Sequence, residues 1–430
     1  MSFLRAAPWC ALCACVFFVT PAPASTSGAV IHAEPRTAAE VAAVLQPSLR
    51  RAWEASPQVQ LAEAELRAAR ARASAAAQPV YNPSIQIDGE NADVDRRTAG
   101  VSLTLDMSGK RQARVAESDA ETRAREAALL LARRDTAAAW LKAWAGVSLA
   151  EEQSAMGSRR MALMRRFDDL AAKGLRVGDI SLPERDLASL ALGEAAMQQA
   201  TLLGQEAALR GALAAVAGGD TARLPPFPHV LPPEADSVQP VTTEQRPLLL
   251  RTRAERDRAD AGVTVARRAR APDPTVSLTG GRVRSGTRTD RVVGISVSIP
   301  LPVRNTGRAD IAAAQADADA AFASHRAASM QADAGLVQAR ATYVALRDAM
   351  AVVQQGRAAA LDERSRTLEK LWQAGEIDTT DYLTQLKQGL DTALGALALE
   401  SQAWQAWFDY LAAAGRLTDW IQPSPEETSP

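Results

Sequence analysis

The sequence predicts a mainly α-helical protein with a small β part, in which one structural unit occurs twice. Long stretches are rich in Ala and nearly free of Pro, and aromatic residues make up only 4% of the 430 residues. This composition is typical of long helices that approach each other closely. Short segments of alternating apolar and polar residues indicate strands. Matching landmarks recur at nearly constant offsets, which indicates a duplication.

The first 24 residues (1–24) have the pattern of a secretory signal peptide. Arg5 precedes an apolar run from Trp9 to Val19, which ends at an A-x-A cleavage site, Ala22-Pro23-Ala24. All three cysteines lie in this leader, so the mature chain is expected to have no disulfide and no thiolate metal site. Leu12-Cys13-Ala14-Cys15 loosely resembles a lipoprotein box, which keeps lipidation open as an alternative. No later segment is long and apolar enough for a transmembrane helix, so a membrane crossing must use strands.

The remaining composition argues against nucleic-acid binding and against catalysis. Lys and Arg number 49 against 50 Asp and Glu, so the molecule as a whole does not attract nucleic acid. The histidines His32, His229 and His325 are far apart and have no ligand spacing, so each is expected to be an ordinary surface residue. The sequence contains no phosphate-binding loop, zinc-protease motif or nucleophile elbow. The prediction is a protein that is not an enzyme, with no catalytic residue, no cofactor and no metal site.

Two sets of landmarks define the duplication. Asn82-Pro83 matches Asp273-Pro274 with an offset of 191, and Gly178-Asp179-Ile180 matches Gly375-Glu376-Ile377 with an offset of 197. The expected boundaries are a first structural repeat at 25–218, a Pro-rich linker at 219–240, a second structural repeat at 241–415 and a C-terminal tail at 416–430.

Each repeat is expected to contain a helix, a strand pair and a long helical hairpin. The strand pairs cover 84–107 and 275–301, and the hairpins cover 110–216 and 307–415. Between Lys110 and Ala172 the chain has no Pro, and a continuous helix there extends roughly 95 Å at ~1.5 Å per residue. Gly174 to Gly178 in the first repeat and Gly375 in the second are expected to break the rods.

The strands alternate apolar residues with Ser, Thr, Gly, Gln and Asp, so each has one apolar face. Four strands with such a face cannot close a barrel alone, and in water they expose both edges and apolar surface. The pattern fits a transmembrane barrel of three copies, with its apolar face toward lipid. The residues expected to face lipid are Ile85, Ile87, Val101, Leu103, Leu105, Val276, Leu278, Val293, Ile295, Val297 and Ile299.

Four segments carry a family resemblance: Tyr81 to Ile85, Leu103 to Arg111, Pro272 to Val276 and Val293 to Pro302. Their duplicated order resembles the TolC-like outer-membrane efflux factors, most closely the branch that serves heavy-metal efflux pumps. The resemblance implies a homotrimer in the outer membrane of a Gram-negative bacterium. It implies a 12-stranded transmembrane β-barrel in contact with outer-membrane lipid, and a trimeric periplasmic α-barrel made of the helical hairpins.

The function implied by this resemblance is the exit duct of a tripartite pump. The duct conducts small molecules or metal cations passively to the exterior, and its partners are a periplasmic adaptor (membrane fusion) protein and an inner-membrane RND transporter. The alternative is a soluble periplasmic coiled-coil scaffold or adaptor with a water-facing sheet. That alternative explains the hairpins but leaves the alternation in all the strands as coincidence.

The hairpin tips supply the remaining candidate residues. Acids near the tips are favoured at helix starts by capping and by the helix dipole, or else the acids of three chains ring the periplasmic aperture and select for cations. These acids are Asp179, Glu376, Asp378 and Asp381. The resemblance also implies that the tip turns dock on the adaptor, with a plain interhelical turn as the alternative. The docking residues are Gly174, Leu175, Val177, Gly178 and Gly375.

Overall fold

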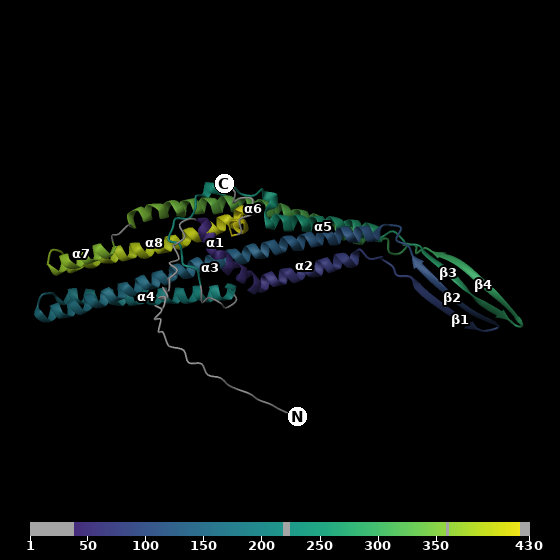
Figure 1. Ribbon diagram of the computed structural model, residues 1–430, viewed down its shortest axis with the longest axis horizontal. Coiled ribbons are helices and arrows are strands. Elements are labelled where there is room, and N and C mark those ends of the chain that lie inside the picture. Colours follow the sequence, from purple (N-terminus) through teal and green to yellow (C-terminus); the bar gives the residue numbers. More distant parts are fainter. Residues whose placement is uncertain (1–37, 218–223, 358–360, 422–430) are drawn as a thin grey trace, which may run out of the picture. The chain divides into compact units, whose positions relative to one another are not determined.

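The computed structural model describes residues 38–217, 224–357 and 361–421 (Figure 1). The expected signal peptide and the segment that resembles a lipoprotein box lie outside these ranges. So do the first residues of the expected linker and most of the expected C-terminal tail.

Helices form most of the described chain, and a small sheet completes it, which confirms the mainly α prediction. None of the helices in these ranges combines the length and apolarity needed to cross a bilayer. The helices are α1 (Ala38–Ala55), α2 (Pro57–Ala76), α3 (Lys110–Val177), α4 (Leu182–Ala217), α5 (Pro247–Ala269), α6 (Arg308–Arg357), α7 (Leu361–Gln373), α8 (Thr379–Ala414) and α9 (Leu417–Ile421).

The sheet has four antiparallel strands in the order β1-β2-β3-β4 (Figure 1). Their bounds are β1 (Ser84–Asn91), β2 (Val94–Thr104), β3 (Thr275–Ser285) and β4 (Arg288–Ser298). The β2–β3 pairing joins the hairpin of the first repeat to that of the second. Within the described chain, β1 and β4 therefore form the two edges of the sheet.

The second β-hairpin repeats the pairing of the first. Ser84 lies opposite Ser102 in the first hairpin, and Thr275 lies opposite Ser298 in the second. Thr275 follows Ser84 by 191 residues, and Ser298 follows Ser102 by 196. The same two offsets relate every other pair of the first hairpin to a pair of the second.

Both strand pairs end earlier than expected at their C-terminal ends. The first was expected to reach Met107, but β2 ends at Thr104, because the Asp106 carboxylate accepts hydrogen bonds from the backbone N–H groups of Lys110 and Arg111 at 2.9 and 2.8 Å. Asp106 thereby caps the start of α3. The second pair was expected to reach 301, but β4 ends at Ser298, since Pro300 has no N–H to donate to the ladder.

Helix α3 is one unbroken helix of 68 residues, and it contacts α2, α4, α5 and α8. Its buried residues near the sheet include Ala113, Ala120, Ala124 and Ala127. Small side chains at these positions let the neighbouring helices approach closely. One helix therefore connects the base of the sheet to the tip of the first hairpin.

The few aromatic residues are concentrated in two buried clusters. The larger cluster packs α1, α3, α6 and α8 together around Trp140, Trp144, Tyr343, Trp404 and Trp407, each at most 2% exposed. The smaller cluster lies at the tips of the helical hairpins. Small side chains dominate the buried face of α3 near the sheet, whereas the bulky aromatic side chains are gathered in these two clusters.

Candidate functional site

One face of the sheet is apolar and exposed. Ile85, Val101, Leu278 and Ile295 lie directly opposite one another across the four strands, so their side chains share one face. They are 78, 52, 56 and 76% exposed. The other strand positions expected to face lipid occupy the same face in neighbouring rows, and all are exposed: Ile87, Leu103, Val276, Val293 and Val297. Leu105 and Ile299 lie just beyond the strand ends and are exposed as well.

The opposite face of the sheet is polar. Ser84, Ser102, Ser277 and Ser296 form one row across it, and the hydroxyl oxygens of Ser84 and Ser102 lie 2.6 Å apart. In the next row the hydroxyls of Thr104 and Thr275 lie 2.8 Å apart across the β2–β3 pairing. The sheet thus separates apolar from polar surface, as alternation requires.

A buried ion pair joins the two repeats at the base of the sheet. Asp273, just before β3, is 4% exposed, and its carboxylate lies 2.7 Å from the Lys110 ammonium at the start of α3. The Tyr81 hydroxyl donates to the same carboxylate at 2.8 Å, and the Ser108 hydroxyl donates at 3.3 Å. Burial alone raises the pKa of a carboxyl, but Lys110 and these hydroxyls outweigh it and lower the pKa of Asp273. These contacts place Asp273 at the junction of the two repeats, a role that the sequence pattern did not predict.

At the first tip, the helix break expected over Gly174 to Gly178 lies at the last residue of that range. Gly174, Leu175 and Val177 lie in the last turn of α3, and only Gly178 is outside it, with a left-handed φ of 84°. The Asp179 N–H donates to the Gly174 carbonyl at 2.9 Å, which closes the helix end. Ile180 packs against Gly174, and its side chain lies 3.4 Å from where a Cβ would be. Asp179 itself is exposed.

The return helix of the first tip is capped by an acid. The Glu184 carboxylate accepts hydrogen bonds from both the hydroxyl and the N–H of Ser181 at 2.7 Å. These two bonds lower the pKa of Glu184. This arrangement is one half of a capping box.

The second tip also has a left-handed glycine and an acid that caps its return helix. Gly375 has φ of 73°, and Asp378 is the N-cap of α8, its carboxylate accepting from the Asp381 N–H at 2.6 Å. Glu376, Asp378 and Asp381 are exposed. Asp378 therefore serves at least as a helix cap, and the role of the four tip acids at an aperture stays a prediction.

An aromatic cluster holds the two hairpin tips together. The Phe167 ring of α3 lies 4.9 Å from that of Trp372 and 5.4 Å from that of Tyr382, centroid to centroid. Burial raises the pKa of Tyr382 to about 12. Met164 is buried in the same cluster, where it packs as an apolar residue.

His229 corrects the expectation that each histidine is an ordinary surface residue. Its ring nitrogens lie 3.1 Å from a Glu152 oxygen and 3.4 Å from a Glu400 oxygen. Glu400 is 1% exposed, and the two carboxylates raise the pKa of His229 to about 10. The imidazole is therefore charged at neutral pH and ties the segment between the repeats to α3 and α8.

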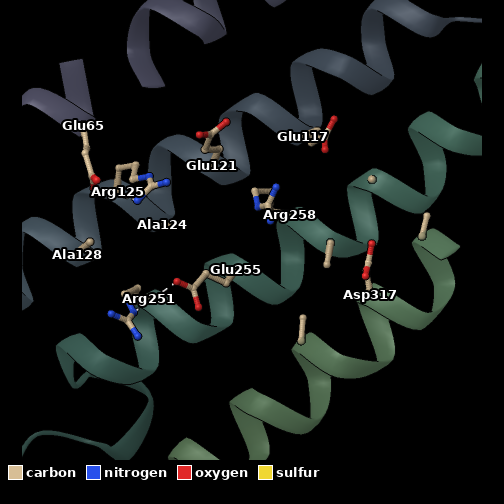
Figure 2. Close-up of a pocket in the computed structure, with 14 residues that line it drawn as sticks. Glu65, Glu117, Glu121, Ala124, Arg125, Ala128, Arg251, Glu255, Arg258 and Asp317 are labelled. Carbon is tan, nitrogen blue, oxygen red and sulfur yellow. Dashed lines mark hydrogen bonds and ion pairs between the residues drawn. The ribbon is translucent and has the colours of Figure 1, made fainter. Parts of the chain in front are cut away.

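A cavity of about 890 Å³ lies among α2, α3, α5 and α6 (Figure 2). Glu117 and Glu121 of α3, Arg258 of α5 and Asp317 of α6 contribute to its wall. Arg125 donates to Glu65 at 2.9 Å on its α2 side. The wall thus carries both signs of charge. Within the described ranges, no group of three or more His, Cys, Asp or Glu could hold a metal ion.

Comparisons with known proteins give a consistent answer. The model of the outer membrane efflux protein family matches residues 241–416. The cobalt-zinc-cadmium resistance protein CzcC of Cupriavidus metallidurans is 28% identical over 255 residues. This match spans 56% of the present chain and 59% of that relative.

Solved structures show the same fold over most of the chain. The CmeC outer membrane channel of Campylobacter jejuni is 15% identical, with a TM-score of 0.73 over 87% of this chain and 86% of that one. The outer membrane protein VceC of Vibrio cholerae is 18% identical, with a TM-score of 0.69 over 86% and 96%. The resemblance to the TolC-like outer-membrane efflux factors is therefore confirmed, and in sequence it extends to the heavy-metal resistance branch.

Proposed function

We propose that this protein is the outer-membrane exit duct of a tripartite efflux system and works as a homotrimer. The observation that carries the proposal is the sheet, which has an exposed apolar face, a polar face and two edges that no other strand of the described ranges pairs with. Such a sheet is stable in a bilayer only when its edges are closed by further strands. Three copies supply twelve strands, enough for a barrel with a wet lumen.

The pairing between the repeats is a template for the pairing between copies. Val101 lies opposite Leu278 where β2 meets β3. The counterpart of Val101 in the second repeat is Val297, 196 residues later, and the counterpart of Leu278 in the first is Ile87, 191 residues earlier. In a closed ring, Val297 of one copy therefore lies opposite Ile87 of the next, and apolar residues stay on one face.

Paired cysteines test this register, because the three native cysteines all lie in the expected leader. Cα atoms of directly opposite residues are about 4.5–5.5 Å apart, which a disulfide can span. We expect Val297→Cys with Ile87→Cys in one chain to give covalent dimers and trimers on non-reducing gels. Within one chain the two residues are on opposite edges of the sheet, about 14 Å apart across the strands at ~4.8 Å per strand and about 13 Å apart along them, so they cannot be bridged.

The matched control moves one cysteine by one residue. Val297→Cys with Gln86→Cys places the second thiol on the polar face, and we expect no crosslink. Crosslinking of both pairs to the same extent, or of neither pair in a membrane extract, contradicts the proposed ring. A monodisperse monomer in detergent-free buffer contradicts the duct altogether.

The hairpin tips are the proposed contact with the periplasmic adaptor, through which the duct is connected to an inner-membrane RND transporter. Large apolar residues are exposed at the first tip, where Val177, Leu182 and Leu190 are 72, 61 and 71% exposed. Exposed apolar residues grouped in this way are typical of a binding surface. Because the curated relative is a cobalt-zinc-cadmium resistance protein, we propose divalent metal cations as the transported substrate.

The tip acids are proposed to make the periplasmic aperture selective for cations. Asp378→Asn with Asp381→Asn removes six charges from a trimer, so the cation-to-anion permeability ratio should fall in planar-bilayer recordings. Asn caps a helix about as well as Asp, so the stability of the trimer should change by no more than about 0.5 kcal/mol. An unchanged permeability ratio together with a lower melting temperature contradicts the selective aperture and leaves these acids as caps.

A further inference from the structure

Arginines form a row at the margin of the apolar sheet face. Arg97 lies opposite Arg282, and Arg282 lies opposite Arg291, across three neighbouring strands. Each is two residues beyond the last apolar row, toward the hairpin turns, so each points to the apolar face. Arg284 lies one further row out, opposite Asp95. All four arginines are exposed.

This row has few internal counter-charges. Arg97 pairs with Asp95, with Nε 3.2 Å from Oδ1. Among the described residues, no carboxylate forms an ion pair with Arg282, Arg284 or Arg291. Like charges directly opposite each other destabilise a sheet. An external anion between these guanidinium groups offsets that repulsion.

The apolar face is hollowed beside the arginines. A cavity of about 670 Å³ is lined by Gly89, Ala99 and Gly280, which have little or no side chain. The charged residues around it are Arg97, Arg282 and Arg284 together with Asp88 and Asp95, so arginines outnumber carboxylates by three to two. The hollow opens onto the apolar face, since Ala99 and Gly280 lie in the same row as Ile87 and Val293.

We propose that this hollow binds the phosphate group of a membrane lipid, with the lipid's acyl chains lying along the apolar face. The inference rests on the proposed function, which places this face in a bilayer. A guanidinium fork matches phosphate oxygens in a bidentate manner, and the Arg row lies at the boundary between apolar surface and hairpin turns, where a headgroup lies. Continuity with the apolar face identifies a lipid rather than a free phosphate, because only a lipid contacts both surfaces.

The test measures lipid binding to detergent-solubilised trimer by native mass spectrometry. The probes are dioleoyl phosphatidic acid, dioleoylglycerol, which has the same chains without phosphate, and inorganic phosphate. We expect the trimer to bind phosphatidic acid about tenfold more tightly than dioleoylglycerol. Arg282→Gln with Arg284→Gln, which removes two of the arginines that line the hollow, should abolish most of this preference.

A matched variant controls for net charge. Arg96→Gln with Arg288→Gln also removes two arginines from the strands, but these two lie on the polar face, and we expect the lipid preference to be retained. Equal loss in both variants, equal binding of the two lipids, or competition by inorganic phosphate at the concentration of the lipid overturns the inference. Failure of the proposed function is distinct, since the protein then does not form a detergent-dependent trimer. Both variants are first checked for a trimer on native gels.

Discussion

Ile295→Arg and Val297→Arg are expected to prevent trimer assembly in the outer membrane, whereas Ser296→Arg is tolerated. Both apolar residues are on the exposed apolar face, 76 and 59% exposed, and Ser296 is on the other. An arginine facing lipid costs about 2–4 kcal/mol near the bilayer midplane and less toward its edges. An arginine at 296 faces the wet lumen and stays solvated. The measurement is the amount of trimer in outer-membrane fractions, quantified by immunoblotting.

The three positions are consecutive, so differences in local backbone structure do not explain a difference between them. Equal damage from all three substitutions, or the reverse order, means that the apolar face does not meet lipid. The soluble scaffold then becomes the better interpretation of the chain.

Lys110→Met is expected to destabilise the folded protein by about 3–5 kcal/mol, because it leaves the Asp273 carboxylate buried without its cation. Tyr81 and Ser108 still donate to that carboxylate, but neither carries charge. The double variant Lys110→Met with Asp273→Leu should regain most of the loss, since no unpaired charge is left buried. Guanidinium unfolding of the detergent-solubilised protein measures the difference. A Lys110→Met protein as stable as the wild type shows that the pair contributes nothing.

The pH dependence of the same pair has a defined sign. The folded pKa of Asp273 is lowered, so its contribution to stability is present above the unfolded value of about 3.9 and is lost as pH falls through the folded value. The folded pKa of Lys110 is raised, because Asp273 outweighs burial, so that contribution is present below about 10.4 and is lost as pH rises further. The stability gap between wild type and Lys110→Met should therefore be widest between about pH 4 and 10.

Much of the architecture could be predicted from local patterns. Alternation alone assigns Ile85, Val101, Leu278 and Ile295 to the apolar faces of their strands, because a strand places every second side chain on the same side. The absence of Pro after Lys110 predicts a long helix, and α3 extends to Val177. These features depend on residues close together in the sequence.

Other features depend on contacts between distant residues. Asp273 and Lys110 are 163 positions apart, and only the register of β2 on β3 brings them together. The helix break expected over Gly174 to Gly178 is found at Gly178, and the contact of Ile180 with Gly174 across the turn cannot be read from composition. The aromatic clusters escaped prediction for the same reason, since each gathers residues from several helices that are far apart in the sequence.

The ion pair at the base of the sheet also distinguishes two kinds of seam in the proposed ring. Asp273 and Lys110 belong to different repeats, and their counterparts are Asn82, 191 residues before Asp273, and Arg308, which follows Gly307 as Lys110 follows Gly109. Both counterparts are exposed in the single chain. At the seam between copies, the Asn82 amide therefore stands where Asp273 has a carboxylate, and the desolvation free energy of an amide is smaller than that of a charged carboxylate. In the proposed ring, the seam within a chain thus carries a buried ion pair, whereas the seam between copies uses residues that a single subunit can expose to water without an unpaired carboxylate.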